Sequence, residues 1–240
     1  MEEMKIHTAG DSSVLIEFGQ EISPEINATI TAFVHLMKAQ HVEGVKDMIP
    51  AFTSLLINYD PRVVNYGALK ERLEKLLKLE VSQETAPSRI FDIPVCYGGE
   101  YGPDLENIAM HANLSTQEVI DIHSSEDYLI YMLGFLPGFS YLGGLDERIH
   151  TPRLANPRIP AGSVGIGGSQ TGIYPLDSPG GWQLLGLTPV KTYDPNREIP
   201  ILFEAGDYIH FVPVTEKDFL EIKEQVNQGT YECVIRQKGV

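Results

Sequence analysis

Residues 162–182 read GSVGIGGSQTGIYPLDSPGGW, and this stretch decides the fold class of the chain. Short apolar runs alternate in it with glycine, proline and serine, the pattern of short β-strands joined by tight turns. No amphipathic helix follows the glycines, so the pattern favours barrel strands over a strand-to-helix phosphate loop. Because glycine lets a ligand approach the main chain closely, the run could also form a backbone-lined pocket wall. Trp182 follows the last turn and either stacks on a ligand or fills the barrel.

A loop that carries two arginines precedes this stretch. Residues 151–160 read TPRLANPRIP, in which three prolines stiffen an extended segment of an otherwise acidic protein. The guanidinium groups of Arg153 and Arg158 suit bidentate contacts with a carboxylate or phosphate, so the loop predicts capture of an anionic ligand. The alternative is a surface loop whose arginines pair with nearby Asp or Glu.

Residues 133–144, LGFLPGFSYLGG, interleave aromatic side chains with turn formers. This composition suits the rim of an apolar pocket or a protein-binding surface, and it also suits barrel core. The candidate partner-binding residues in the segment are Phe135, Leu136, Pro137, Phe139, Tyr141 and Leu142.

The spacing of turns and apolar runs predicts that residues 86–240 form a mainly β barrel domain. Such punctuation favours a barrel or sandwich over a doubly wound sheet. Helices are expected near residues 104–111, 115–124 and 216–227, and strands near residues 90–95, 199–203, 208–214 and 231–236.

Residues 1–85 are predicted to form a separate α+β domain. Ser23 and Pro24 supply an N-cap and a first-turn proline for a helix with one apolar face. Two strand-helix-strand units in succession predict a split βαβ-like sandwich. The elements expected are strands at 12–18, 45–49 and 54–59 and a second helix at 66–79, and the polar residues 81–88 mark the domain boundary.

Composition excludes several classes of protein. The formal charge is −15, which disfavours long contacts with the phosphates of nucleic acid. The two cysteines lie far apart in the sequence, the first residues lack an apolar signal core, and no apolar run approaches membrane-spanning length. We therefore expect a reduced cytoplasmic protein that binds no membrane.

Catalytic residues cannot be assigned from motifs. The chain has no Gly-x-Ser-x-Gly elbow, no phosphate-loop motif and no His-Glu-x-x-His helix. Its seven histidines are scattered without ligand spacing on one helix face, so no metal site is expected. Glu100, Asp146 and Asp177 could transfer protons, or they could cap turns.

Five blocks of sequence carry a family resemblance that covers the whole second domain. The blocks are residues 94–100, 134–145, 152–160, 161–175 and 179–189. Together they resemble the family of 5-oxoprolinase B subunits, which is also called allophanate hydrolase subunit 1. The resemblance implies a cyclophilin-like β-barrel for the second domain, without implying prolyl isomerase activity.

The resemblance also implies a function as one component of an enzyme. The complex would contain the A and C subunits of 5-oxoprolinase, would use ATP, and would cleave 5-oxoproline to L-glutamate, whereas the isolated chain would be inactive. The identity of the ATP-binding component stays open. The ligand-binding residues expected on this reading are Arg153, Arg158, Gln170, Thr171, Tyr174 and Trp182.

Two further functions follow from members of the same family. One is inhibition of a sporulation sensor histidine kinase, through binding to its dimerisation and phosphotransfer domain. The other is a role as a hydrolase component in allophanate or urea metabolism, because the quoted blocks do not separate the substrates.

Overall fold

The computed structural model describes residues 4–79 and 88–238. Contacts divide the chain into two compact units, Met1–Pro87 and Ser88–Val240. The predicted boundary between residues 85 and 86 lies outside the described residues.

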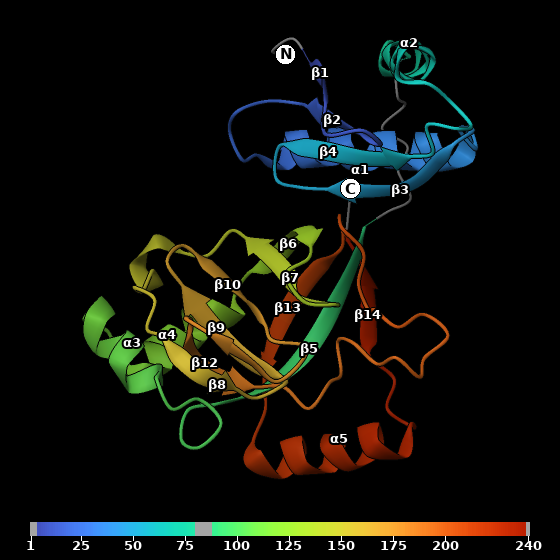
Figure 1. Cartoon of the computed structure of the whole chain (residues 1–240). Coiled ribbons are helices and arrows are strands. Elements are labelled where there is room, and N and C mark those ends of the chain that lie inside the picture. Colours follow the sequence, from blue (N-terminus) through green and yellow to red (C-terminus); the bar gives the residue numbers. More distant parts are fainter. Residues whose placement is uncertain (1–3, 80–87, 239–240) are drawn as a thin grey trace. The chain divides into compact units, whose positions relative to one another are not determined.

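The first unit is a four-stranded antiparallel sheet with two helices (Figure 1). Its elements are β1 (Lys5–Thr8), β2 (Ser13–Glu17), α1 (Pro24–Ala39), β3 (Val45–Pro50), β4 (Ser54–Tyr59) and α2 (Tyr66–Leu77). The strand order is β1-β2-β4-β3. Because β4 is antiparallel to both β2 and β3, the strands that α1 connects run parallel with β4 between them. This is the geometry of a split βαβ unit.

The helices of the first unit begin where the sequence predicts. The Ser23 side chain accepts a hydrogen bond from the Ile26 N–H, with proline in the first turn of α1. The buried faces of α1 and α2 meet alternate residues of β2 and β4 in one core that includes Val14, Phe33 and Leu73. The strand β1 was not expected from the sequence, because the short segment Lys5–Thr8 is mostly exposed and carries no apolar run.

The second unit contains a long sheet of eight strands and a separate pair. The order is β10-β9-β12-β5-β13-β6-β7, with β14 also paired to β5, and β8 pairs with β11. The bounds are β5 (Arg89–Tyr97), α3 (Leu105–Ala112), α4 (Thr116–Ser124), β6 (Asp127–Leu133), β7 (Ser140–Gly143), the 3₁₀ turn η1 (Glu147–Ile149), β8 (Asn156–Ile159), β9 (Ser163–Gly167), β10 (Gln170–Ile173), β11 (Ser178–Gly180), β12 (Gln183–Leu187), β13 (Tyr208–Pro213), α5 (Glu216–Gln228) and β14 (Val234–Gln237).

This sheet curls into a nearly closed barrel. Its terminal strands β7 and β10 contact one another, although they pair with different neighbours. At its centre, β5 pairs in parallel with β13 and antiparallel with β12 and β14. The barrel predicted for this part of the chain is therefore confirmed as a nearly closed, barrel-like sheet, which α3, α4 and α5 accompany.

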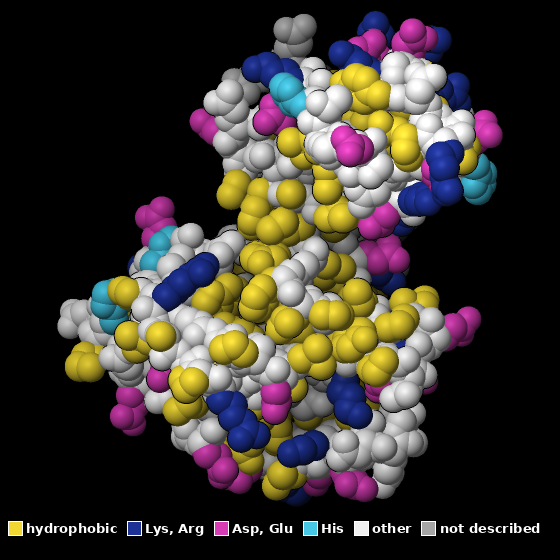
Figure 2. All heavy atoms as spheres, viewed as in Figure 1, with side chains coloured by type: hydrophobic (Ala, Val, Ile, Leu, Met, Phe, Trp, Pro, Cys, Tyr) yellow, Lys and Arg dark blue, Asp and Glu magenta, His cyan; other side chains and the backbone are white. Residues whose placement is uncertain are grey.

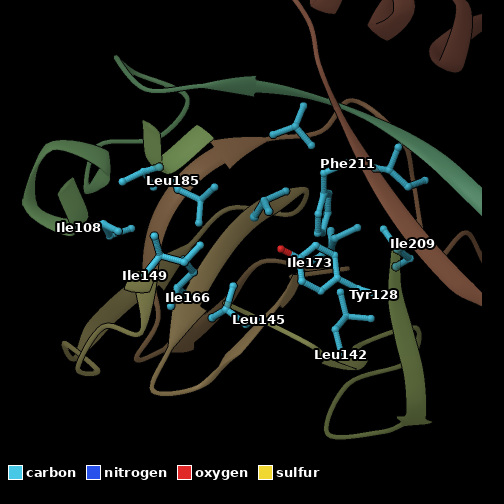
Figure 3. Close-up of a cluster of buried hydrophobic side chains, with 14 of the residues drawn as sticks. Ile108, Tyr128, Leu142, Leu145, Ile149, Ile166, Ile173, Leu185, Ile209 and Phe211 are labelled. Carbon is cyan, nitrogen blue, oxygen red and sulfur yellow. The ribbon is translucent and has the colours of Figure 1, made fainter. Parts of the chain in front are cut away.

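Aliphatic and aromatic side chains from most strands fill the barrel interior (Figure 3). Ile166, Ile173 and Phe211 are fully buried there, and α3 and α4 add Ile108 and Val119 to the same cluster. Leu142 also points into this core, so it lies inside the barrel rather than on a binding surface.

One predicted strand is wrong. Residues 199–203 form only an isolated bridge between Ile201 and Tyr193, because Pro200 interrupts the segment and has no N–H to donate to a ladder. The helix predicted at 216–227 is confirmed as α5, which Thr215 caps and Gly229 ends with a left-handed backbone.

Candidate functional site

The glycine-rich stretch forms the hairpin β9–β10, and its glycines make room for Trp182. A Cβ at Gly167 would overlap the indole ring, and a Cβ at Gly172 would lie 2.9 Å from Trp182 Cζ3. The indole is only 5% exposed. The interpretation as barrel strands is confirmed, and no helix follows the hairpin that would make it a phosphate loop.

Three aromatic rings that flank the ends of different strands meet beside this hairpin: Phe139 precedes β7, Tyr174 follows β10 and Trp182 precedes β12. The Phe139 centroid lies 5.4 Å from that of Tyr174 and 5.3 Å from that of Trp182, and the latter two are 5.8 Å apart. Each pair is close to perpendicular, the arrangement that ring quadrupoles favour. The rings form a rigid apolar wall.

A pocket of about 200 Å³ opens against this wall. Its lining combines aromatic rings, the backbone of two glycines and one arginine: Phe135, Phe139, Tyr141, Arg153, Tyr174, Gly180, Gly181 and Trp182. The pocket thus brings together residues from all three segments that the sequence singled out. An apolar cleft with one cation suits a small anionic ligand with a flat body.

Arg153 supplies the positive charge of this pocket. Its Nη2 donates to Gln170 Oε1 at 3.3 Å, so two predicted ligand-binding residues lie together. Two consecutive hydrogen bonds hold the residue that precedes Arg153. The Asn107 side chain donates to Gln183, and Gln183 Nε2 donates to the Pro152 carbonyl at 2.6 Å. Since Gln183 is buried, this bond positions the start of the arginine loop.

Tyr174 presents its hydroxyl to the glycine turn. Burial raises the pKa of this phenol, although backbone N–H groups of Trp182 and Gly181 donate to its oxygen and Arg153 lies near. The phenol is therefore neutral at physiological pH. A Cβ at Gly180 would approach the hydroxyl to 2.5 Å, so glycine is required there.

Phe135 forms the outer rim of the pocket. It lies in the loop between β6 and β7, is 68% exposed, and stands edge-on to Phe139 at 5.7 Å. Its φ of 65° is rare for a bulky residue and costs on the order of 1 kcal/mol. Such strain, held by the surrounding loop, is frequent in binding sites.

Three of the predicted ligand-binding residues do not line this pocket, and of these Gln170 is connected to it only through its hydrogen bond with Arg153. Arg158 has an 83% exposed side chain and its Nη2 lies 3.9 Å from Asp177 Oδ2, the local pairing that was the alternative for this loop. Thr171 is fully buried and donates to the Gly165 carbonyl at 3.1 Å.

Among the candidate acids, Asp146 caps a turn. Its side chain accepts a hydrogen bond from the Arg148 N–H, and the adjacent Arg148 guanidinium lowers the pKa of its carboxyl group to about 2.

A buried hydrogen-bonded chain runs through His123, a residue that the sequence did not single out. The Nδ1 atom lies 2.8 Å from the Tyr97 hydroxyl, and Nε2 lies 2.7 Å from Thr171 Oγ1. Because Thr171 donates its proton to Gly165, His123 Nε2 donates to Thr171 and Nδ1 accepts from Tyr97. Burial lowers the pKa of His123 to about 3, so the ring is neutral. Its i,i+4 spacing from the buried Val119 on α4 was the available signal.

Metal ligands and membrane spans are both absent from the part of the chain that the structure describes. The described residues hold no group of three His, Cys, Asp or Glu side chains placed to bind a metal ion. Within residues 4–79 and 88–238, no helix is long and apolar enough to cross a membrane.

The sequence matches a known family over most of its length. The family described as Carboxyltransferase domain, subdomain C and D matches residues 4–203. The B subunit of 5-oxoprolinase from Bacillus subtilis (strain 168) is 45% identical over 235 residues, covering 93% of this chain and 98% of that protein. The B subunit of 5-oxoprolinase from Escherichia coli O157:H7 is 41% identical over 222 residues, covering 90% of this chain and 99% of the other.

A solved structure supports the fold. The urea amidolyase of K. lactis superimposes with a TM-score of 0.77 at 23% identity, covering 98% of this chain and 16% of that chain. At this identity the similarity concerns the fold alone. From the family match and the two close relatives, the chain belongs to the family of 5-oxoprolinase B subunits, within the carboxyltransferase subdomains C and D.

Proposed function

We propose that this chain is the B subunit of an ATP-dependent 5-oxoprolinase complex and that its aromatic pocket holds 5-oxoproline. The names of the relatives at 45% and 41% identity support the reaction class. The observation that carries the assignment of the pocket is the position of Arg153 at the edge of an aromatic wall.

The ligand and the pocket are complementary in chemistry. 5-Oxoproline has a flat lactam ring and one carboxylate. The ring packs against Phe139, Tyr174 and Trp182, and the carboxylate accepts hydrogen bonds from the Arg153 guanidinium, with Gln170 holding that group in place. The rim residue Phe135 covers the ring on the solvent side.

ATP does not fit this pocket. A volume of about 200 Å³ is too small for a nucleoside triphosphate, and the glycine hairpin offers no helix N-terminus for phosphates. We therefore place the use of ATP with the complex and not in this pocket. The lactam is a poor electrophile, and phosphorylation of its oxygen would activate it toward water; we assign no catalytic acid or base to this chain.

Replacement of Arg153 tests the proposal. Arg153→Gln in the reconstituted complex is expected to raise the KM for 5-oxoproline about tenfold or more, as loss of a charge-assisted hydrogen bond does. Arg158→Gln, which changes the arginine paired with Asp177, measures whether the second arginine contributes, and we expect a change of about twofold or less. Lys217→Gln on the outer face of α5 serves as control.

The same variants separate the substrates. If the Arg153→Gln complex keeps wild-type kinetics with 5-oxoproline, the pocket assignment is wrong. Turnover of allophanate in place of 5-oxoproline would favour the alternative in urea metabolism, which the fold similarity to urea amidolyase alone does not support.

A second proposed function is inhibition of a sensor histidine kinase through the exposed rim. On the face of the second unit that Figure 2 shows, hydrophobic side chains gather among scattered lysines and arginines. The exposed fractions of Phe135 and Leu154 are 68% and 51%, and these two exposed apolar side chains are the observation that favours a protein partner. Phe139 and Leu142, at 3% and 1% exposed, do not contribute to that surface.

An autophosphorylation assay tests this second function. At a saturating concentration, this protein should lower the autophosphorylation of a sporulation-type kinase fragment. The Phe135→Ser variant should lower it less. Unchanged autophosphorylation would reject this second function.

The detailed barrel type is likewise a proposal. We infer that the second unit is a cyclophilin-like barrel, and we do not propose prolyl isomerase activity for it.

A further inference from the structure

A second pocket lies between α5 and the loops at one end of the barrel. Its volume is about 190 Å³. One wall is the face of α5 that carries Phe219, Lys223 and Asn227 at i,i+4 spacing. The other walls are residues 161–162, 174–175 and 187–192. None of the residues predicted to bind a ligand lines this pocket except Tyr174, which borders both cavities.

The barrel side of this second pocket is rigid. Gly162 N–H donates to the Tyr174 carbonyl at 2.7 Å, and Thr188 N–H donates to the Gly162 carbonyl at 2.9 Å. Gly162 has a φ of +86°, and a Cβ there would lie 2.5 Å from the Thr188 carbonyl oxygen. This wall of the second pocket is therefore preformed in the absence of a ligand.

Two lysines bring positive charge to opposite walls of the second pocket in a chain of net charge −15. Lys191 Nζ lies 4.0 Å from Asp194 Oδ2, a distant pair with the lysine side chain 52% exposed. Lys223 Nζ stands 5.8 Å from the Phe219 ring centroid and, among the described residues, forms no ion pair. Among the described residues the Lys223 ammonium is therefore free of ion pairs, and the Lys191 ammonium has one long, exposed pair that a bound anion could replace.

Two threonines add hydroxyl groups to the same lining. Thr188 Oγ1 accepts the Val190 N–H at 3.2 Å, which leaves its own proton for another acceptor. Thr192 is 1% exposed, and its hydroxyl has no hydrogen-bond partner among the described residues. A buried hydroxyl of this kind requires a partner.

We propose that this second pocket binds a small organic anion. Its carboxylate or phosphate group is held by Lys191 and Lys223, and its hydrocarbon part packs on Leu187, Val190 and Phe219. The shared chemistry is an oxyanion on a short apolar body, because inorganic ions would leave the apolar lining unused. The site is separate from Arg153 and goes beyond the proposed 5-oxoproline pocket.

Titration of the full chain by NMR at constant ionic strength tests this site. The probes are acetate, butanoate and inorganic phosphate, followed through the amide signals of residues 187–192 and 219–227. Butanoate is expected to bind saturably and about tenfold more tightly than acetate, since two further methylenes are buried. Lys191→Gln and Lys223→Gln should each weaken butanoate about tenfold.

Two variants serve as controls and separate this proposal from the first. Lys217→Gln, whose lysine is 84% exposed on the outer face of α5, should leave butanoate binding unchanged. Arg153→Gln should also leave it unchanged, so failure at one pocket does not affect the conclusion at the other. The proposal would be overturned if no probe bound saturably, or if the wild-type chain and both pocket lysine variants bound butanoate equally. If the chain preferred phosphate to butanoate, the assignment of an organic anion as the ligand would be overturned.

Discussion

At the scale of single residues, burial and not a neighbouring charge sets the ionisation of His123. The ring lies at the centre of a hydrogen-bonded chain with Tyr97 and Thr171, which requires the neutral tautomer with a proton on Nε2. Protonation would place an unpaired cation among Tyr128 and Phe211, whose rings pack on the imidazole. The neutral state is therefore a condition of the fold.

The stability of the protein should fall in mild acid because of this histidine. Its pKa is about 3 when folded against an ordinary 6.5, so its contribution is complete above pH 6.5 and is lost as the pH falls toward 3. The free energy of unfolding should drop by about 2 kcal/mol between pH 8 and pH 5 through this group.

Urea unfolding across that pH range measures the effect. His123→Gln can hydrogen bond but cannot titrate, so its stability should change less with pH than that of the wild type. Parallel curves for the two proteins, or an NMR titration of His123 with a midpoint near 6.5, would contradict a neutral buried imidazole.

A methyl group at Gly172 should disturb the aromatic wall. Alanine there would press on the Trp182 indole and the Ser140 carbonyl, so we expect a loss of about 1–3 kcal/mol in stability. Trp182 is the single tryptophan, and its emission should shift to longer wavelength. Ser169→Ala, in the exposed hairpin turn, is the matched control; unaltered emission from Gly172→Ala would show that the glycine is not needed for the indole.

At the scale of elements, local signals predict helices well and the positions of side chains poorly. The N-caps Ser23, Ser115 and Thr215 all start the helices expected from the sequence. A proline in an apolar run misled the strand prediction at residues 199–203, where pairing needs an N–H. The role of Gly167 and Gly172 could not be predicted, because it depends on contact with Trp182, which lies outside the hairpin, just before β12.

The capping box of α4 offers a test at this scale. Ser115 accepts the Glu118 N–H at 3.2 Å, and Glu118 accepts the Ser115 N–H at 2.8 Å. Ser115→Ala should cost about 1 kcal/mol of unfolding free energy, whereas Gln117→Ala on the exposed face should cost less than half of that. Denaturant midpoints compare the two, and equal losses would argue against the capping interaction.

At the scale of the whole molecule, each unit has its own core. The cluster of the first unit draws its buried members from residues 14–76, and the two clusters of the second unit draw theirs from residues 91–211. We propose that residues 86–240 form an independent domain, as the sequence predicts. A chain of residues 88–240 should unfold cooperatively by calorimetry; a fragment without a cooperative transition would show that the second unit needs the first.

The candidate site illustrates how far sequence reasoning extends at this scale. The three segments around Phe135, Arg153 and Trp182 were each singled out, and they do converge on one pocket. Which arginine lines it was not predictable, because Arg153 and Arg158 stand five residues apart in one loop and only the fold separates them. No sequence motif predicted the pocket beside α5, because its two lysines, Lys191 and Lys223, come from segments that are distant in the sequence.

The most direct test of the central claim is an omission experiment on the reconstituted complex. ATP-dependent release of glutamate from 5-oxoproline is measured with this chain alone, with its candidate A and C subunits alone, and with all three. Release is expected only in the full mixture, with a large increase in KM when the chain carries Arg153→Gln. Equal release by the A and C subunits without this chain would contradict the proposed function.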